Sequence, residues 1–407
     1  MLRCGLLGGK LGHSYSPRIH AMLGDYEYRL YEKAPAELES FLLRGDWDGL
    51  NVTIPYKKSV LRYCSALSET AAHTGSVNTL LRLPGGRIYG ENTDVFGFEA
   101  LLRHAGYEAR GKRAAVLGNG GGAAAVREAL RRQGTAEVIT LCRGSEYFSD
   151  PSFLGDIQLV INATPVGMYP NNGAAAIELR ALRGCEFAVD LIYNPARSAL
   201  LLEAERLGIP CADGLYMLSA QAKRSSEIFT GTELDDGLID RVERTLRREE
   251  RNVILIGMPG CGKSSMARLL GEALGRRVYD ADDEIVRAAG CDIPAIFARG
   301  GEEEFRSLET QTLRELGKLS GAVIATGGGC VTREENYPLL HQNGVLIWLR
   351  RGLEKLPTDG RPISMSADLG ELYARRAPLY ARWADHTVSN DAAPENTLRE
   401  LLAVLET

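Results

Sequence analysis

Residues 257–264 read Gly-Met-Pro-Gly-Cys-Gly-Lys-Ser, and this stretch decides the fold of the second half of the chain. Its spacing, G-x-x-x-x-G-K-S, is that of a loop whose backbone N–H groups surround the phosphates of a nucleoside triphosphate. An apolar run at 253–256 precedes the loop, and a helical pattern at 263–274 follows it. This order predicts a P-loop NTPase-type α/β domain with a parallel sheet, which we place at residues 252–407.

Residues of this loop are expected to bind ATP. Lys263 would contact the β- and γ-phosphates, and the hydroxyl group of Ser264 would ligate Mg²⁺. The other contacts would come from Gly257, Gly260, Cys261, Gly262 and Ser265. Asp280 and Asp282 follow the next short strand, where a carboxylate can hold magnesium or take a proton from a hydroxyl group. Either of the two could instead be an ordinary helix N-cap.

A different glycine turn lies upstream and has the form G-x-G-x-x-A. It follows an apolar run at 114–117 and opens a helical pattern at 123–132, which is the context of a dinucleotide site. The residues expected to contact the dinucleotide here are Gly118, Asn119, Gly120, Gly121, Gly122 and Ala123. The next strand ends at Arg143, whose planar cation suits a ribose 2′-phosphate and favours NADP over NAD. A solvent-facing arginine at a strand end is the alternative.

The order of elements predicts how the first half is divided. Strand patterns at 2–8, 49–54 and 79–83 precede the dinucleotide turn, so residues 1–100 read as an α/β substrate domain. Residues 101–213 read as a Rossmann-like domain, and a helix from about 215 would return to complete the first domain with residues 214–246. A ligand would lie between the two domains. The charged run at 247–251 reads as a short, partly helical linker.

Composition excludes several classes of function. The chain has 407 residues and a formal net charge of −5, which argues against a nucleic-acid or anionic-membrane partner. We find no apolar run of the roughly 18 residues that a membrane span needs, and the N-terminus is too short in apolar residues for a signal peptide. The eight cysteines form no C-x-x-C pair and read as reduced thiols of a cytoplasmic protein. A monomer, or a homodimer formed through the first half, remain the alternatives.

Polar motifs in the first half suggest a substrate site. Ser14 and Ser16 flank a tyrosine before Pro17, and Ser16 with Pro17 reads as a helix N-cap and first turn. Two hydroxyl groups beside a helix N-terminus also make a cradle for a carboxylate. Further motifs are N-V-T-x-P-x-K at 51–57, G-x-V-N-T at 75–79 and N-T-D at 92–94. Taken singly, Lys57 reads as a surface lysine and Asp94 as a turn residue.

In this order, the motifs resemble the shikimate dehydrogenase family, and the resemblance covers roughly residues 1–245. It continues through Asn-Ala-Thr-Pro-Val-Gly-Met at 162–168, Ile-Tyr-Asn-Pro at 192–195 and Met-Leu-Ser-Ala-Gln at 217–221. The resemblance implies that Ser14 and Ser16 hold the substrate carboxylate. The ring hydroxyl groups would be bound by Thr53, Lys57, Asn78, Asp94 and Gln221. Further NADP contacts would come from Thr164, Met168, Tyr193 and Gly214.

The resemblance further implies that Lys57 and Asp94 form the acid/base pair. Reduction of a ketone needs a hydride on carbon and a proton on oxygen, and an ammonium beside a carboxylate can supply that proton. The expected reaction is the NADPH-dependent reduction of 3-dehydroshikimate to shikimate. A quinate/shikimate dehydrogenase that uses NAD is the first alternative.

The second half carries its own set of motifs, which resembles shikimate kinase over about residues 252–395. The motifs are Phe-Arg-x-x-Glu at 305–309, three glycines at 327–329, Asp-Gly-Arg-Pro at 359–362 and Arg-Ala-Pro-Leu-Tyr at 376–380. The resemblance assigns shikimate binding to Asp282, Arg306, Gly328, Gly329 and Arg376. Asp280 would place the metal ion through water. Arg361 would lie on a closing lid at about 351–366, where it would contact ATP and offset charge on the transferred phosphoryl group. The expected catalytic residues of this half are Asp282, Lys263 and Arg361.

The two halves converge on one small molecule. The first would produce shikimate, and the second would phosphorylate its 3-hydroxyl group with ATP and Mg²⁺. A second alternative is a regulatory protein that senses shikimate without catalysis, but Lys57, Asp94, Lys263, Ser264 and Asp282 are all present. A third is a P-loop kinase for another polyol. Paired arginines, Arg306 and Arg376, favour an acceptor that carries a carboxylate.

Overall fold

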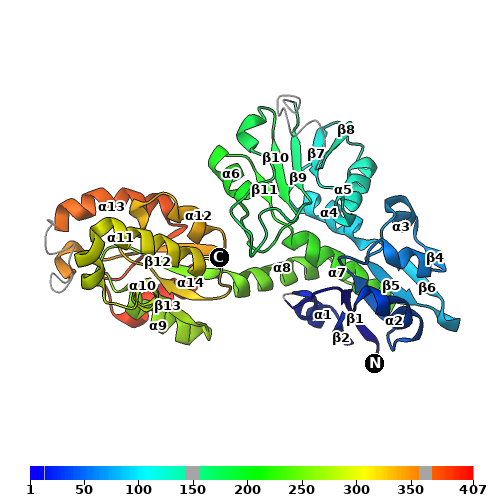
Figure 1. Ribbon diagram of the computed structural model, residues 1–407, viewed down its shortest axis with the longest axis horizontal. Helices are drawn as coiled ribbons and strands as arrows, with labels where there is room; N and C mark the ends of the chain where they lie inside the picture. The colour runs from blue at the N-terminus through cyan, green and yellow to red at the C-terminus, as the bar shows by residue number, and fades with distance from the viewer. Residues whose placement is uncertain (13, 143–155, 357–368, 407) are drawn as a thin grey trace. The chain divides into compact units, whose positions relative to one another are not determined.

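The computed structural model describes residues 1–12, 14–142, 156–356 and 369–406. The chain forms two compact units, one of residues 1–193 with 198–245 and the other of residues 194–197 with 246–407 (Figure 1). The helix α8 (Gly237–Glu250) runs through the boundary, so most of the expected linker at 247–251 is helical.

The first unit begins with a six-stranded mixed sheet in the order β2-β1-β3-β5-β6-β4. Its strands are β1 (Arg3–Gly8), β2 (Glu27–Glu32), β3 (Gly49–Val52), β4 (Ala66–Leu67), β5 (Thr79–Arg82) and β6 (Ile88–Glu91). The strands β1, β2 and β3 are parallel, whereas β5 runs antiparallel to both β3 and β6. Strand β3 is buried along its whole length, and its end delivers the chain to the turn that contains Lys57.

Three short helices accompany this sheet, namely α1 (Ser16–Leu23), α2 (Leu38–Arg44) and α3 (Glu69–Thr74). The prediction that Ser16 is the N-cap of the first helix was wrong by one residue. Tyr15 is the N-cap, because its backbone is already helical and its carbonyl accepts the first helical hydrogen bond, from the N–H of Ile19 at 3.0 Å. Ser16 is therefore the first helical residue, with Pro17 in the first turn, where proline needs no N–H partner.

The second sheet of this unit is parallel throughout and has the order β11-β10-β9-β7-β8. Its strands are β7 (Arg113–Leu117), β8 (Glu137–Leu141), β9 (Leu159–Asn162), β10 (Phe187–Asp190) and β11 (Cys211–Ala212). Its helices, with those that join it to the first sheet, are α4 (Thr93–His104), α5 (Gly121–Arg132), α6 (Ala199–Leu207) and α7 (Leu215–Thr230). The central strands are apolar on both faces because helices cover both, as in a Rossmann-type fold.

The second unit is a five-stranded parallel sheet in the order β13-β14-β12-β15-β16. Its strands are β12 (Asn252–Ile256), β13 (Val278–Asp280), β14 (Val323–Ala325), β15 (Gly344–Arg350) and β16 (His386–Ser389). Its helices are α9 (Lys263–Leu274), α10 (Ala281–Ala289), α11 (Ile293–Leu316), α12 (Asn336–His341), α13 (Leu369–Trp383) and α14 (Pro394–Val404). In Figure 1, α9 and α14 lie on one side of this sheet and α11 and α12 on the other.

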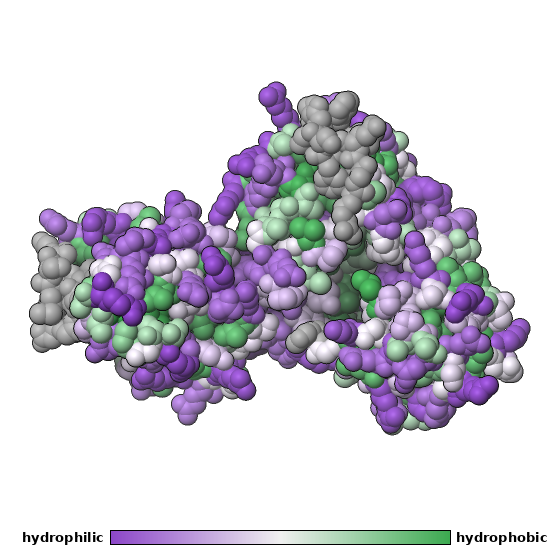
Figure 2. All heavy atoms as spheres, in the orientation of Figure 1, coloured by the Kyte–Doolittle hydropathy of each residue, from purple (hydrophilic) through white to green (hydrophobic). Residues whose placement is uncertain are grey.

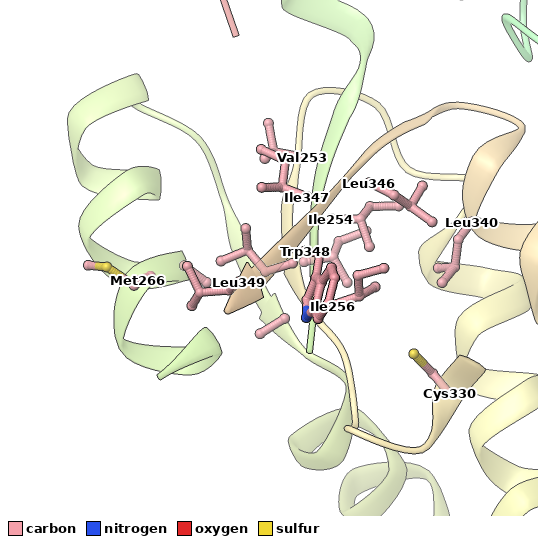
Figure 3. Packing of buried hydrophobic residues seen from close by; sticks show 14 of the residues in the cluster. Val253, Ile254, Ile256, Met266, Cys330, Leu340, Leu346, Ile347, Trp348 and Leu349 are labelled. Carbon is pink, nitrogen blue, oxygen red and sulfur yellow. The ribbon is translucent and has the colours of Figure 1, made fainter. Parts of the chain in front are cut away.

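The core of the second unit centres on β12. Figure 3 shows Ile254 and Ile256 of this strand among side chains of β15, including Ile347 and Trp348. The strand is fully buried because β14 and β15 pair with it on both edges. The phosphate-binding loop therefore begins at the end of the central, fully buried strand of the sheet, which fixes where the loop can present its N–H groups.

Within the ranges that the structure describes, we find no helix that is both long and apolar enough to cross a membrane. On the face that Figure 2 shows, hydrophilic side chains predominate and hydrophobic ones are scattered. All eight cysteines are free thiols.

Candidate active sites

The centre of the first site is an ion pair between Lys57 and Asp94. The Lys57 ammonium donates to Asp94 Oδ2 at 2.6 Å, and the two side chains are 20% and 9% exposed. Asp94 lies in the first turn of α4, where the helix dipole favours a negative charge. Taken alone, Asp94 was expected to be a turn residue. In the structure Asn92 has that role, because its side chain accepts from the Asp94 N–H at 3.1 Å. Both oxygens of Asp94 are therefore free to face other side chains.

Asn78 and Gln221 join this pair from two other elements. The Asn78 amide donates to Asp94 Oδ1 at 2.8 Å and lies 3.4 Å from Gln221 Oε1. Its own oxygen accepts from the Thr93 backbone N–H at 2.8 Å, which fixes the orientation of the amide group. The structure thus brings together a cation, a carboxylate and two amides, a set that can bind vicinal hydroxyl groups and move a proton.

The two serines of the N-terminal motif lie beside each other. Ser14 Oγ donates to Ser16 Oγ at 3.1 Å and accepts from the Ser16 backbone N–H at 3.2 Å. Thr53 lies at the end of β3, where its N–H donates to the Leu7 carbonyl at 2.9 Å and its side chain is half-buried. The paired hydroxyl groups at the start of α1 fit a carboxylate, since hydroxyl and backbone donors converge there.

The glycine turn of the expected dinucleotide site packs closely against two other segments. Gly118 has φ +106°, and a Cβ there would lie 3.0 Å from Thr164 Cγ2. At Gly121 a Cβ would lie 3.0 Å from Ser76 Oγ and 3.2 Å from Lys57 Cδ. The N-terminus of α5 therefore lies against the segment that carries Lys57, which places a dinucleotide bound at this turn next to the ion pair.

The remaining predicted cofactor residues line the same end of the parallel sheet. Asn119 and Gly120 are exposed on the turn, Gly122 is half-buried and Ala123 is buried. Thr164 donates to Asn162 Oδ1 at 2.6 Å, and the Met168 side chain is 45% exposed.

Of two further predicted cofactor residues, Tyr193 follows β10 and Gly214 follows β11. Burial raises the pKa of the Tyr193 hydroxyl, and the Tyr193 ring packs on Tyr15 with a centroid distance of 5.3 Å. A Cβ at Gly214 would come 2.0 Å from the Leu191 carbonyl oxygen, so only glycine fits there. Arg143, on which the choice of NADP rests, lies outside the described residues.

The second site begins with the phosphate-binding loop. Gly257, Gly260 and Gly262 have φ values of +145°, +81° and +96°, which side chains rarely adopt. Lys263 is buried, and its ammonium donates to the carbonyl oxygens of Gly257 and Met258, each at 2.9 Å. The loop is thus curled around the lysine, as a phosphate cradle requires.

The other residues of the predicted ATP site surround the start of α9. Cys261 is buried within the loop, Ser264 is half-buried and Ser265 is exposed. The residues 357–368, which include Arg361 and cover most of the predicted lid, lie outside the described residues.

The topology of the sheet brings the residues that are expected to bind the phosphoryl acceptor beside this loop. In parallel strands the carboxyl ends share one edge, so the loops after β12, β14 and β13 are neighbours there. Gly328 packs on Pro259 of the phosphate-binding loop, since a Cβ there would come 2.6 Å from Pro259 Cδ. Arg376 donates to the Gly328 carbonyl at 3.2 Å, and the Tyr380 hydroxyl donates to the same oxygen.

Arg306 lies flat against the neighbouring glycine. A Cβ at Gly329 would come 2.1 Å from an Arg306 guanidinium nitrogen, and a Cβ at Gly327 would come 3.2 Å from Asp282 Oδ1. Arg306 and Arg376 are both buried, and Nε of Arg376 has no hydrogen-bond partner among the residues that the structure describes. Two guanidinium groups and a carboxylate around a side-chain-free turn suit a small molecule that carries one carboxylate and several hydroxyl groups.

Asp280 has the structural role of a helix N-cap, which the sequence left open as the alternative to metal binding. It is the N-cap of α10, and its Oδ1 accepts from the Asp282 N–H at 3.0 Å. Among the residues that the structure describes, no group of three or more His, Cys, Asp or Glu side chains could hold a metal ion. The Ser264 hydroxyl group and the Asp280 carboxylate are oxygen donors that follow neighbouring parts of one parallel sheet, and oxygen donors of this kind fit Mg²⁺ that retains several waters.

Comparison with known proteins assigns both halves. A shikimate dehydrogenase (NADP(+)) of Clostridium perfringens (strain SM101 / Type A) is 33% identical over 266 residues, a match that covers 60% of this chain and 97% of the relative. This chain belongs to the shikimate dehydrogenase family. Residues 6–80 match the family described as shikimate dehydrogenase substrate binding domain, and residues 259–406 match shikimate kinase. One chain therefore joins a shikimate dehydrogenase to a shikimate kinase domain.

Solved structures support the same assignment for the dehydrogenase half. Shikimate 5-dehydrogenase from Thermus thermophilus, solved with NADP(H) and shikimate, is 31% identical with a TM-score of 0.55, covering 60% of this chain and 99% of that one. Quinate dehydrogenase from Corynebacterium glutamicum, solved with NAD, is 28% identical with a TM-score of 0.53, covering 60% and 98%. These likenesses confirm the α/β fold with a Rossmann-like domain.

The dehydrogenase half contains a buried carboxylate that sequence reasoning missed. Asp190, at the end of β10, has no exposed surface and accepts from Ser198 Oγ at 2.5 Å and from the Asn162 amide at 3.0 Å. It also accepts from the Ile192 N–H at 3.0 Å, so it anchors the segment that leads to Tyr193. Burial raises the pKa of Asp190 to about 6, against the pull of these three donors. The only signal in the sequence is an aspartate that ends an otherwise apolar strand.

This pKa predicts a pH-dependent stability. The native state holds the Asp190 proton more tightly than the unfolded chain does, so the contribution of this group to stability falls as the pH rises through about 6. The substitution Asp190→Asn removes that dependence. We expect the free energy of unfolding of the variant, relative to the wild type, to rise by about 1–3 kcal/mol between pH 4 and pH 7. Hydrogen exchange of peptides from β9 and β10 measures this free-energy difference between variant and wild type. A difference that does not change with pH contradicts the prediction.

The shikimate kinase domain holds a second missed carboxylate. Glu309 belonged to a motif seen in the sequence, but no role was assigned to it. It is fully buried, and its Oε2 accepts from the Arg306 guanidinium at 2.6 Å. Burial raises the pKa of Glu309, with Asp282 adding to the effect and Arg306 opposing it. Glu309 is therefore the group that holds Arg306 against the glycine turn.

The substitution Glu309→Gln is expected to weaken shikimate binding. It removes the charge that compensates a buried guanidinium, so Arg306 loses its fixed position. We expect the KM for shikimate to rise by about 10-fold or more, with the KM for MgATP unchanged. The control is Glu302→Gln, because Glu302 also contacts Arg306, at 3.2 Å, but is 58% exposed. Equal effects of the two substitutions would contradict the assignment.

Proposed function

We propose that this chain catalyses two consecutive reactions on one small molecule. The first is the NADPH-dependent reduction of 3-dehydroshikimate to shikimate, and the second is the ATP-dependent phosphorylation of the shikimate 3-hydroxyl group. The observation that carries the first is the Lys57–Asp94 pair, held by Asn78 and lying against the N-terminus of α5. The second is supported by Arg306, Arg376 and Asp282 around the glycine turn beside the phosphate-binding loop.

In the dehydrogenase, one group of residues would bind the substrate and another would transfer the proton. Ser14 and Ser16 would hold the substrate carboxylate, and Thr53 with Asn78 and Gln221 would bind the ring hydroxyl groups. NADPH, held by the turn at 118–123, would supply the hydride for the carbonyl carbon. Lys57 would deliver the proton to the developing alkoxide, and Asp94, 2.6 Å away, holds the Lys57 side chain in place before that transfer.

In the kinase, catalysis would come mainly from positioning of the two substrates and from stabilisation of negative charge. Arg306 and Arg376 would hold the shikimate carboxylate so that the 3-hydroxyl group faces the terminal phosphate of ATP. Asp282 would accept the hydroxyl proton, and Lys263 would stabilise negative charge on the transferred phosphoryl group. Ser264 would ligate Mg²⁺, with Asp280 acting through water, and Arg361 would act from the lid.

The experiment gives the purified chain 3-dehydroshikimate, NADPH and MgATP and follows both steps. Loss of NADPH absorbance reports the first, and chromatography of the products reports shikimate and shikimate 3-phosphate. Without MgATP, the reaction should stop at shikimate. Shikimate binding without any turnover would favour the alternative of a shikimate-sensing regulator.

The second candidate function is a quinate/shikimate dehydrogenase joined to the kinase. The structural likeness to a quinate dehydrogenase solved with NAD keeps it open. Oxidation rates with quinate and shikimate, each measured with NAD and NADP, separate the two. Comparable rates with quinate and NAD would replace the narrower proposal.

A further inference from the structure

A half-buried asparagine at the end of the kinase sheet contacts the phosphate-binding loop. Asn390 directly follows β16, and its side-chain amide donates to the Cys261 carbonyl oxygen at 2.7 Å. Because a carbonyl oxygen only accepts, the nitrogen of the amide group must be the atom that faces the loop. The same nitrogen lies against Gly262, where a Cβ would come within 2.5 Å of it. A side chain 129 residues away from Cys261 in the sequence therefore contacts the last peptide unit before α9.

The backbone of Asn390 is itself held in place by two neighbouring elements. Its N–H donates to the Arg350 carbonyl at 2.7 Å, beside the last residue pair of β15 and β16, which is Arg350 with Ser389. The Ser389 carbonyl in turn accepts from the hydroxyl group of Thr397, a buried residue of α14, at 3.2 Å. The sheet and α14 thus fix the point from which the Asn390 amide reaches the loop.

The peptide unit between Cys261 and Gly262 is fixed at both of its ends. The Cys261 N–H donates to the Met258 carbonyl at 3.2 Å, and the Gly262 carbonyl accepts from the Met266 N–H at 2.9 Å. Between these points the peptide unit can still turn over, because glycine adopts φ of either sign and the φ of Gly262, now +96°, would become negative. The hydrogen bond from Asn390 opposes this rotation, since it holds the carbonyl group of the peptide unit.

The direction of this carbonyl also determines the direction of one N–H group. In a trans peptide unit the C=O and N–H bonds lie in one plane and point in opposite directions. Because the Cys261 carbonyl points toward Asn390, the Gly262 N–H points to the other side. Loops of the form G-x-x-x-x-G-K-S bind phosphate groups through backbone N–H groups of this kind.

We propose that Asn390 is a positioning residue for the kinase reaction, because it holds the Cys261 carbonyl so that the Gly262 N–H is presented to the phosphates of ATP. This inference rests on the proposed function, since it concerns the same ATP site. Asn390 acts through the backbone of another segment and needs no contact with the nucleotide. Without its amide group the 261–262 peptide unit is no longer held in one orientation, and a smaller share of the loops presents this donor.

The test replaces Asn390 with leucine, which has nearly the same shape but no N–H group in its side chain. In Asn390→Leu, the KM for MgATP should rise by about 10-fold, the effect of losing one hydrogen bond to a charged group, while the KM for shikimate stays unchanged. Asn390→Ala should give the same rise, because the donor and not the volume of the side chain is responsible. The control is Asn396→Ala, since Asn396 is an exposed asparagine near the start of α14. This variant should leave both constants unchanged.

Inorganic tripolyphosphate separates this role from a contact with the adenine base. It carries phosphate groups but no base, so its inhibition constant against MgATP should rise in Asn390→Leu by the same factor as the KM for MgATP. The inference is overturned by an unchanged KM for MgATP, by a raised KM with an unchanged inhibition constant, or by an equal rise in the KM for shikimate. Equal effects of Asn390→Leu and Asn396→Ala overturn it as well. A wild type that does not phosphorylate shikimate instead refutes the proposed function and is seen before any variant is made.

Discussion

Replacing Lys57 with alanine is expected to lower the rate of dehydroshikimate reduction by about 10²–10⁴-fold, the usual contribution of a general acid. The substitution removes the proton donor 2.6 Å from Asp94 and leaves that carboxylate, which is 9% exposed, without its counter-charge. The measurement is kcat for NADPH oxidation at saturating substrate. Kinase activity should be unchanged, because Lys57 belongs to the other compact unit.

The neighbouring lysine provides the matched control. Lys58 is exposed and has the same charge, so Lys58→Ala tests whether loss of one positive charge in this turn is enough to slow the reaction. We expect it to behave as the wild type. If Lys58→Ala and Lys57→Ala were equally impaired, the effect would be one of general electrostatics and the proton-donor role would be wrong.

Replacing Lys263 with alanine should have the converse effect. We expect kcat/KM for shikimate phosphorylation to fall by about 10²–10³-fold, as when one preorganised donor to a developing charge is lost. The buried ammonium also bonds two carbonyl oxygens of its own loop, so the variant loop loses part of its shape. Dehydrogenase activity in the same preparation should be unchanged.

Its control is Arg268→Ala, because Arg268 is an exposed cation on the same helix, α9. This variant should retain both activities. A Lys263→Ala protein that lost dehydrogenase activity as well would contradict the view that the two sites work independently within one chain.

Much of the architecture could be predicted because the glycine turns are strict in their chemistry. Each turn follows an apolar strand and opens a helix, and positive φ values at Gly118, Gly257 and Gly262 leave few alternatives to glycine. Lys57 and Asp94 could be paired only through the family resemblance, since 37 residues separate them and each has an ordinary role when taken alone.

The residues that could not be predicted act through partners distant in sequence. Ser225 of α7 contacts Asn51 and Thr79 of the first sheet across 174 and 146 residues, and nothing local marks a serine in a helix for such contacts. Asp190 and Glu309 are buried carboxylates whose roles depend on neighbours that only the fold supplies. The error at Ser16 had a local cause, because Ser-Pro marks the start of a helix without fixing which residue is its cap.

The helix α7 returns to the first sheet only after the whole dinucleotide-binding sheet has been made. During synthesis, Asn51, Thr79 and Thr93 must therefore wait for a segment that leaves the ribosome 174, 146 and 132 residues later, respectively. A truncated product that stops after α4 would contain Lys57 and Asp94. It would lack Gln221 and Ser225 of α7, whose side chains contact Asn78 and Thr93 next to this pair. We therefore expect the amino-terminal segment that ends with α4 to lack a complete substrate site when it is made alone.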